Sequence, residues 1–170
     1  MKFFFNSFFI VGYFFIGFCQ AQDCKGITKF KSPVFEAYVG IIDIPADYEN
    51  TTANKFDTID LGKYVRSDTS FILGLSAEVI NASTLSNLAI VTLEFDDNSR
   101  LVKSGQSIHS TPMTRGRAIL STNVRLTLRE ILMLKNRALT SITVADSQII
   151  VAETVANALR KVAGCLPTFW

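Results

Sequence analysis

The strongest constraint on the fold is a pair of cysteines near opposite ends of the chain. Cys24 and Cys165 are the two that remain once an N-terminal leader carrying Cys19 is removed. In an oxidising compartment an even number of cysteines in such a chain predicts a disulfide. The bond would hold the start of the mature chain against a C-terminal helix. By restricting the unfolded chain it would contribute at most about 5 kcal/mol of stability.

Two other roles for these cysteines are weaker alternatives. A redox-active thiol pair normally has the Cys-x-x-Cys spacing, which the sequence lacks. A metal site would need further His or Cys ligands at short spacing, which are also missing. We therefore expect a structural disulfide, and we expect no metal and no cofactor.

The first residues have the composition of a secretory signal peptide. A lysine is followed by an apolar run, Phe3 to Phe18, that holds eight of the fourteen phenylalanines, and the small residues Cys19 and Ala21 suit cleavage after Ala21. The run of about sixteen residues is shorter than the ~20 that a transmembrane helix needs. We expect residues 1–21 to be a signal peptide and residues 22–170 a single secreted or periplasmic domain, with no membrane span in the mature chain. An uncleaved anchor or a lipoprotein acylated at Cys19 is the alternative.

The charge balance excludes two classes of partner. The chain has 17 Lys and Arg against 15 Asp and Glu, for a net charge of +2. Nucleic acids and acidic membranes both require a concentrated basic face. We therefore expect no nucleic acid partner, and an unknown protein or envelope component is the expected partner.

Alternation of apolar and polar residues predicts strands through most of the chain. The clearest case is Phe71 to Val79, where every second residue is apolar. Turn residues at 96–99 lie between two β-prone runs and predict a hairpin. We expect strands over residues 34–44, 56–65, 71–79, 88–95, 100–103, 118–126 and 141–151, the last split near Asp146, and a polar loop over residues 105–116.

Two helices are expected late in the chain. Thr127 and Glu130 have the spacing of a capping box, and the apolar positions after them predict a helix that ends near Asn136. Apolar residues from Val151 to Val162 recur at helical spacing before Gly164 ends the pattern. The expected fold class is α+β, a mostly antiparallel sheet with two helices late in the chain packed on one face.

No catalytic constellation stands out among the polar residues. His109 is the only histidine, and no Gly-x-Ser-x-Gly motif accompanies it. We expect it to face solvent in a loop, and a binding surface, if present, would comprise His109, Arg115 and Arg117, because arginines bind carboxylates and phosphates in forked pairs. The alternative is a small secreted hydrolase that uses His109 with Asp96 or Asp97 as the acid.

Two other groups of residues have a simple interpretation. Asp57 and Asp60 are three apart, and we expect both to be solvated strand positions rather than a carboxylate pair. Asn50 and Asn81 each begin the acceptor pattern of N-glycosylation. In a eukaryotic protein they would be used, giving a glycosylated secreted factor, and in a bacterial protein they would have no role.

Several short segments occur together in this chain. They are the leader ending in Ala21, the strand–turn–strand 93–101, the helix start 126–131 and Cys165 after a helix. This combination resembles small exported proteins of uncharacterised function from Bacteroidota, over roughly the last half of the mature chain. The resemblance implies a periplasmic or outer-envelope location and unused glycosylation acceptors, and it transfers no activity. We therefore expect a non-enzymatic envelope or secreted domain with a binding or structural role.

Overall fold

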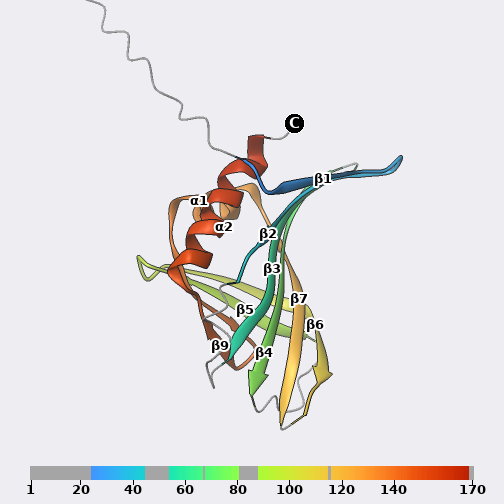
Figure 1. Ribbon diagram of the computed structural model, residues 1–170. Helices are drawn as coiled ribbons and strands as arrows, with labels where there is room; N and C mark the ends of the chain where they lie inside the picture. The colour runs from blue at the N-terminus through green and yellow to red at the C-terminus, as the bar shows by residue number, and fades with distance from the viewer. Residues whose placement is uncertain (1–23, 45–53, 67, 81–87, 115, 169–170) are drawn as a thin grey trace, which may run out of the picture.

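The computed structural model describes residues 24–44, 54–66, 68–80, 88–114 and 116–168 (Figure 1). Within these ranges nine strands form one antiparallel sheet in the order β1-β2-β3-β4-β7-β6-β5-β8-β9, and the sheet is not closed. The strands are β1 (Ile27–Lys31), β2 (Glu36–Ile42), β3 (Lys55–Val65), β4 (Thr69–Ile80), β5 (Leu88–Phe95), β6 (Arg100–Pro112), β7 (Arg117–Leu126), β8 (Leu139–Val144) and β9 (Ser147–Ile150). The helices are α1 (Leu128–Asn136), α2 (Glu153–Cys165) and a 3-10 turn, η2 (Leu166–Thr168).

The expected α+β class is wrong, because the described chain is mainly β and its helices are short. α1 has 9 residues and α2 has 13, whereas β6 alone has 13. The expected strands did not include β1 or the second half of β6, where residues 105–112 continue the strand instead of forming the expected loop. Nearly all side chains in these two stretches are exposed. Apolar alternation therefore could not mark them as strands.

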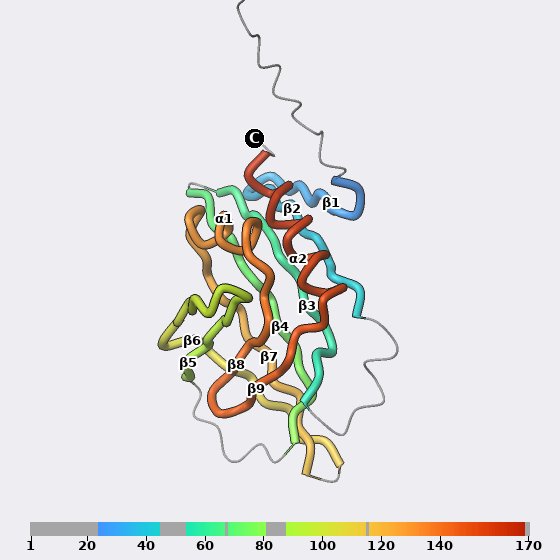
Figure 2. The backbone as a smooth tube through the Cα atoms, turned by 90° about the vertical axis from the view of Figure 1, so that its left-hand side faces the viewer, coloured from blue at the N-terminus to red at the C-terminus, as the bar shows by residue number. Residues whose placement is uncertain are grey.

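The sheet curves around the two helices, which cover its inner face (Figures 1 and 2). Ile59, Leu73 and Val124 of this face are fully buried. Helix α2 packs closely on β2 at Gly40, which has no side chain. A Cβ atom at this position would come within 2.7 Å of both methyl groups of Val162. Lys63 is an exception on this apolar face: its side chain is buried, and the loss of water lowers the pKa of its ammonium group.

A change of partner within β6 allows one sheet to curve this far. Residues 100–107 pair with β5, and residues 108–112 pair with β7. Gly105, near the change, has a φ of +66°, a backbone conformation that strongly favours glycine.

The predicted disulfide is present between Cys24 and Cys165. Their Cα atoms are 5.8 Å apart across a sequence separation of 141. The bond joins the residues before β1 to the last residue of α2, so the cysteine pattern alone was sufficient to predict which ends of the chain meet.

The predicted local motifs are also confirmed. Thr127 caps α1. The Glu130 backbone N–H donates to Thr127 Oγ1 (3.3 Å), and the Thr127 backbone N–H donates to Glu130 Oε2 (2.7 Å). The helix ends at Asn136, as expected. The β5–β6 hairpin closes where the Phe95 N–H donates to the Ser99 carbonyl at 3.0 Å.

Several predictions concern residues outside the described ranges. These are the signal peptide at 1–21, the acceptors Asn50 and Asn81, and the candidate binding residue Arg115. Across the described chain, neither helix has the length and apolar character that crossing a membrane requires.

Candidate functional site

The outer face of the sheet is the side away from the helices (Figure 1). This face carries a hollow of about 520 Å³ over β3, β4, β7 and the bend of β6. We call it the polar hollow. Its lining includes Thr58, Asp60, Ser76, His109, Ser121 and Asn123.

Strand register places these side chains in two rows across the sheet. In the first row Thr58 pairs with Ser76, Ser76 with Ser121, and Ser121 with His109. Directly opposed residues of antiparallel strands have Cβ atoms about 4.5–5.5 Å apart, so each row is continuous. The Ser121 hydroxyl donates to Ser76 Oγ at 3.4 Å. The row therefore offers hydroxyl and imidazole groups side by side.

The second row contains the carboxylate of Asp60. Asp60 on β3 pairs with Gly74 on β4, and Gly74 pairs in turn with Asn123 on β7. The Asp60 carboxylate lies directly over Gly74, where a Cβ atom would overlap it. A glycine inside a strand marks such a close approach. The absence of a side chain at position 74 thus makes room for the carboxylate on the surface of the sheet.

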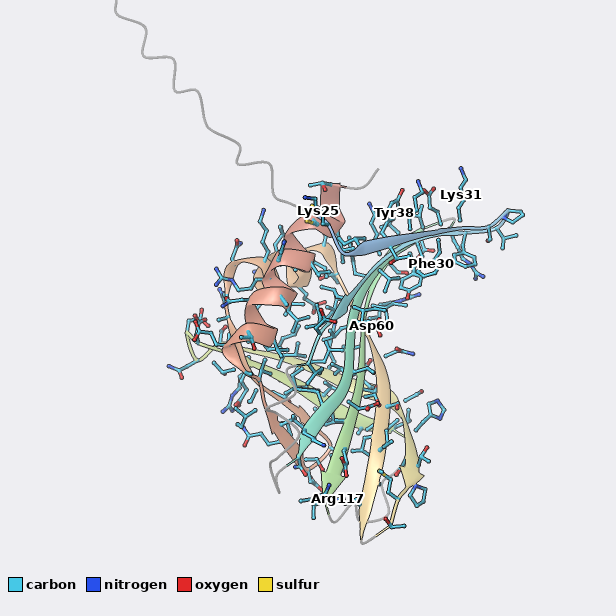
Figure 3. All side chains as sticks on the ribbon, in the orientation of Figure 1. Lys25, Phe30, Lys31, Tyr38, Asp60 and Arg117 are labelled. Carbon is cyan, nitrogen blue, oxygen red and sulfur yellow. A yellow bond between two sulfur atoms is a disulfide. The ribbon has the colours of Figure 1, made fainter. Side chains whose placement is uncertain are left out.

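Asp60, which is labelled in Figure 3, is half-buried. Such an environment is unusual for an acid. Burial raises the pKa of its carboxyl group above the usual range. No side chain of the described residues forms a hydrogen bond or ion pair with it. The expectation that Asp60 is simply solvated is wrong, whereas Asp57 is exposed.

The structure places His109 on β6 rather than in a loop. Its side chain is exposed and lines the polar hollow, opposite Ser121. Arg117 lies four residues before Ser121 on β7, about 13 Å along the strand. The structure therefore does not bring these two predicted binding residues together.

The guanidinium group of Arg117 is already engaged by an acid of the neighbouring strand. Its Nη1 donates to Glu78 Oε1 at 2.6 Å, and Lys55 also pairs with Glu78 at 3.5 Å. The hydrogen bond from Arg117 holds the pKa of Glu78 below its usual range.

The acids suggested for a hydrolase lie far from His109. Asp96 and Asp97 are in the β5–β6 turn, and most of β6 separates them from the histidine. Asp97 accepts hydrogen bonds from Ser99, which lower the pKa of its carboxyl, and pairs with Arg137 at 3.2 Å. Both contacts stabilise the turn.

The chemistry of the polar hollow is hydrogen bonding around one carboxylate. Nowhere in the described ranges do three His, Cys, Asp or Glu side chains gather as metal ligands would. Ser76, Ser121 and Asn123 were not among the predicted site residues. Gly74, within an otherwise regular alternation, was an available sign of a close approach. In comparisons with protein-family models, curated proteins and solved structures, nothing matches this chain.

Proposed function

We propose that the protein is an exported, non-enzymatic binding domain that takes a small polar ligand in the polar hollow. The observation that carries this proposal is the Asp60 carboxylate, which is half-buried and lacks a partner among the described side chains. Leaving a partly desolvated acceptor unpaired costs free energy. A ligand that donates hydrogen bonds, or carries a positive charge, would recover that free energy.

The neighbouring groups favour a ligand with several hydroxyl groups or an ammonium group. Thr58 and Ser121 can each donate and accept, and the Asn123 amide can do both at once. Among the described residues, His109 is the one basic side chain that lines the hollow. An uncharged polyol, a sugar or an amine therefore suits it better than an acid.

Export is supported by two features of the chain. The apolar leader with its small residues before Gln22 has the order of a secretory signal. The Cys24–Cys165 disulfide is typical of proteins that fold in an oxidising compartment. With the resemblance to exported Bacteroidota proteins, these features favour a secreted, periplasmic or envelope location.

Saturation-transfer NMR on the secreted form would test the binding proposal. The panel would contain monosaccharides, polyols, amino sugars and amines. We expect one class to bind, with affinity about tenfold weaker in Asp60→Asn because a charged hydrogen bond is lost. Asp146→Asn, in the exposed β8–β9 turn, removes the same charge elsewhere and should bind normally. Equal affinity in both variants, or no binding across the panel, would refute the proposal.

The same preparation tests the two other functions. Esterase, peptidase or glycosidase activity that is present in the wild type and lost in His109→Ala would replace the binding domain with a hydrolase. A mass shift on deglycosylation that maps to Asn50 and Asn81 would identify a glycosylated eukaryotic factor.

A further inference from the structure

A second hollow, of about 300 Å³, lies on the outer face near the β3–β4 turn. We call it the basic–aromatic hollow. It is lined by Phe35, Tyr64, Arg66, Ser70, Ile72 and Arg125. Ile72 and Arg125 are paired directly across β4 and β7, one row beyond the Gly74–Asn123 pair. The two hollows are therefore neighbours on one face.

Two arginines that line this hollow lack acidic partners among the described residues. Arg66 and Arg125 are exposed, and neither forms an ion pair within the described ranges. In contrast, Arg100, Arg117 and Arg137 each pair with a carboxylate. Two arginines that line one small hollow, and that have no acidic partner in the part of the chain that the structure describes, are suited to a single anionic group. Arginine binds carboxylates in bidentate geometry.

Apart from Ser70, the rest of the hollow is apolar and aromatic. The ring of Tyr64 lies against the backbone of Gly62, where a Cβ atom would come 2.9 Å from Tyr64 Cε2. Burial, and secondarily the charge of Asp60, raise the pKa of the Tyr64 phenol, so its hydroxyl remains a hydrogen-bond donor at neutral pH. This hydroxyl forms no hydrogen bond with any described residue. The ring can stack on a ligand while its hydroxyl donates.

We propose that the basic–aromatic hollow binds a small organic acid with an aromatic body. The carboxylate is held by Arg66 and Arg125, and the ring packs on Tyr64 and Ile72. The hollow is at the lower end of the volumes that ligand pockets occupy, which suits a ligand of one or two rings. This proposal goes beyond the polar hollow and does not depend on a ligand being bound there.

The charge of Asp60 opposes an anion at this position. Its carboxylate acts on the Tyr64 phenol, so it lies close enough to repel a bound acid. The Asp60→Asn variant therefore distinguishes the two sites. It should lower the affinity of the polar hollow for its ligands, and it should preserve or raise the affinity of the basic–aromatic hollow for an aromatic acid.

Isothermal titration calorimetry with matched probes tests the proposal. The probes are 2-naphthoate, 2-naphthylmethanol, 2-naphthylmethylamine and acetate, which separate the charge from the aromatic body. We expect naphthoate to bind at least about tenfold more tightly than the alcohol because of the charge-assisted hydrogen bonds. The amine and acetate should bind more weakly still, and added salt should weaken naphthoate binding. Equal affinity for the acid and the alcohol would overturn the proposal.

Variants locate the binding. Arg125→Gln and Arg66→Gln should each weaken naphthoate binding about tenfold. Arg129→Gln, exposed on α1, removes the same charge from another surface and should leave the affinity unchanged. Circular dichroism on each variant confirms that it is folded. If Arg125→Gln and Arg129→Gln bind naphthoate alike, the hollow is not the site, whatever the outcome at the polar hollow.

Discussion

The inner and outer faces of the sheet are built by alternate residues of the same strands, yet they meet different requirements. On β4, Leu73 is fully buried under the helices, while its neighbours Ile72 and Gly74 face outward. On the inner face the requirement is to fill volume. On the outer face, glycines at positions 62 and 74 leave room for Tyr64 and Asp60 to lie on the sheet. The outer face therefore carries arrangements that packing of the core does not require.

Removal of the disulfide should have the largest effect, because the bond holds α2 over the inner face. We expect Cys24→Ser with Cys165→Ser to lower the free energy of unfolding by about 2–5 kcal/mol. Urea denaturation of the oxidised protein and of the variant measures this. Under conditions where the variant remains folded, naphthoate binding on the outer face should be unchanged. If the two proteins unfold at the same urea concentration, the bond has no structural role.

Truncation of adjacent residues on β4 compares the two faces directly. Leu73→Ala opens a cavity in the core and should cost about 2–5 kcal/mol. Ile72 is only partly buried on the outer face, so Ile72→Ala should cost less than about 1.5 kcal/mol. Denaturant titration of both variants measures the difference. Losses of equal size would contradict the assignment of the two faces.

Filling the space over Gly74 tests the packing of the outer face. Gly74→Ala places a methyl group where the Asp60 carboxylate lies, and we expect a loss of about 1–3 kcal/mol. Ligands of the polar hollow should also bind more weakly. Because the clash is with Asp60, the double variant Asp60→Ala with Gly74→Ala should recover most of the stability. Additive effects in this double-mutant cycle would show that the two residues do not interact.

The sequence predicted those parts of the fold in which one face is buried. The strand at 88–95 has the expected bounds because its apolar residues reflect burial against the core. The helix ends at Asn136 as expected, and the Thr127–Glu130 capping box predicted where it starts. Strand β1 has no buried face, so its residues show no apolar spacing from which a strand could be predicted. The α+β class was wrong because strands of this kind were not counted.

The polar hollow was harder to predict from the sequence than the core, because its residues come together only through the order of the strands in the sheet. β4 pairs with β7, and two other strands intervene in the sequence. Only that pairing sets Gly74 opposite Asn123 and Ser76 opposite Ser121. Alternation predicts which way a side chain points but not its cross-strand partner. Asp60 could therefore be assigned to the outer surface, whereas its partial burial could not be foreseen.

The smallest expected effect is a difference in pH dependence between two carboxylates. Asp60 is unpaired within the described residues, and burial raises its pKa above 3.8. At neutral pH its charge therefore opposes folding, and Asp60→Asn should be more stable than the wild type. The gain should shrink as the pH falls through the folded-state pKa and vanish below about 3.8, where the acid is protonated in both states.

Glu130 should show the opposite sign. Burial raises its pKa, but hydrogen bonds from Lys103 and Thr127 outweigh burial and hold the pKa below 4.5. Its charge therefore stabilises the fold above that pH, and the contribution is lost as the pH falls through the folded-state pKa. Glu130→Gln keeps a side chain that can complete the capping box, so its loss of stability reports the charge and the pair with Lys103. The measurement is the unfolding free energy of each variant relative to the wild type from about pH 3 to 7. As the pH rises, this difference should become more positive for Asp60→Asn and more negative for Glu130→Gln. If the difference has the same sign for both variants, Asp60 has a partner that stabilises its charge.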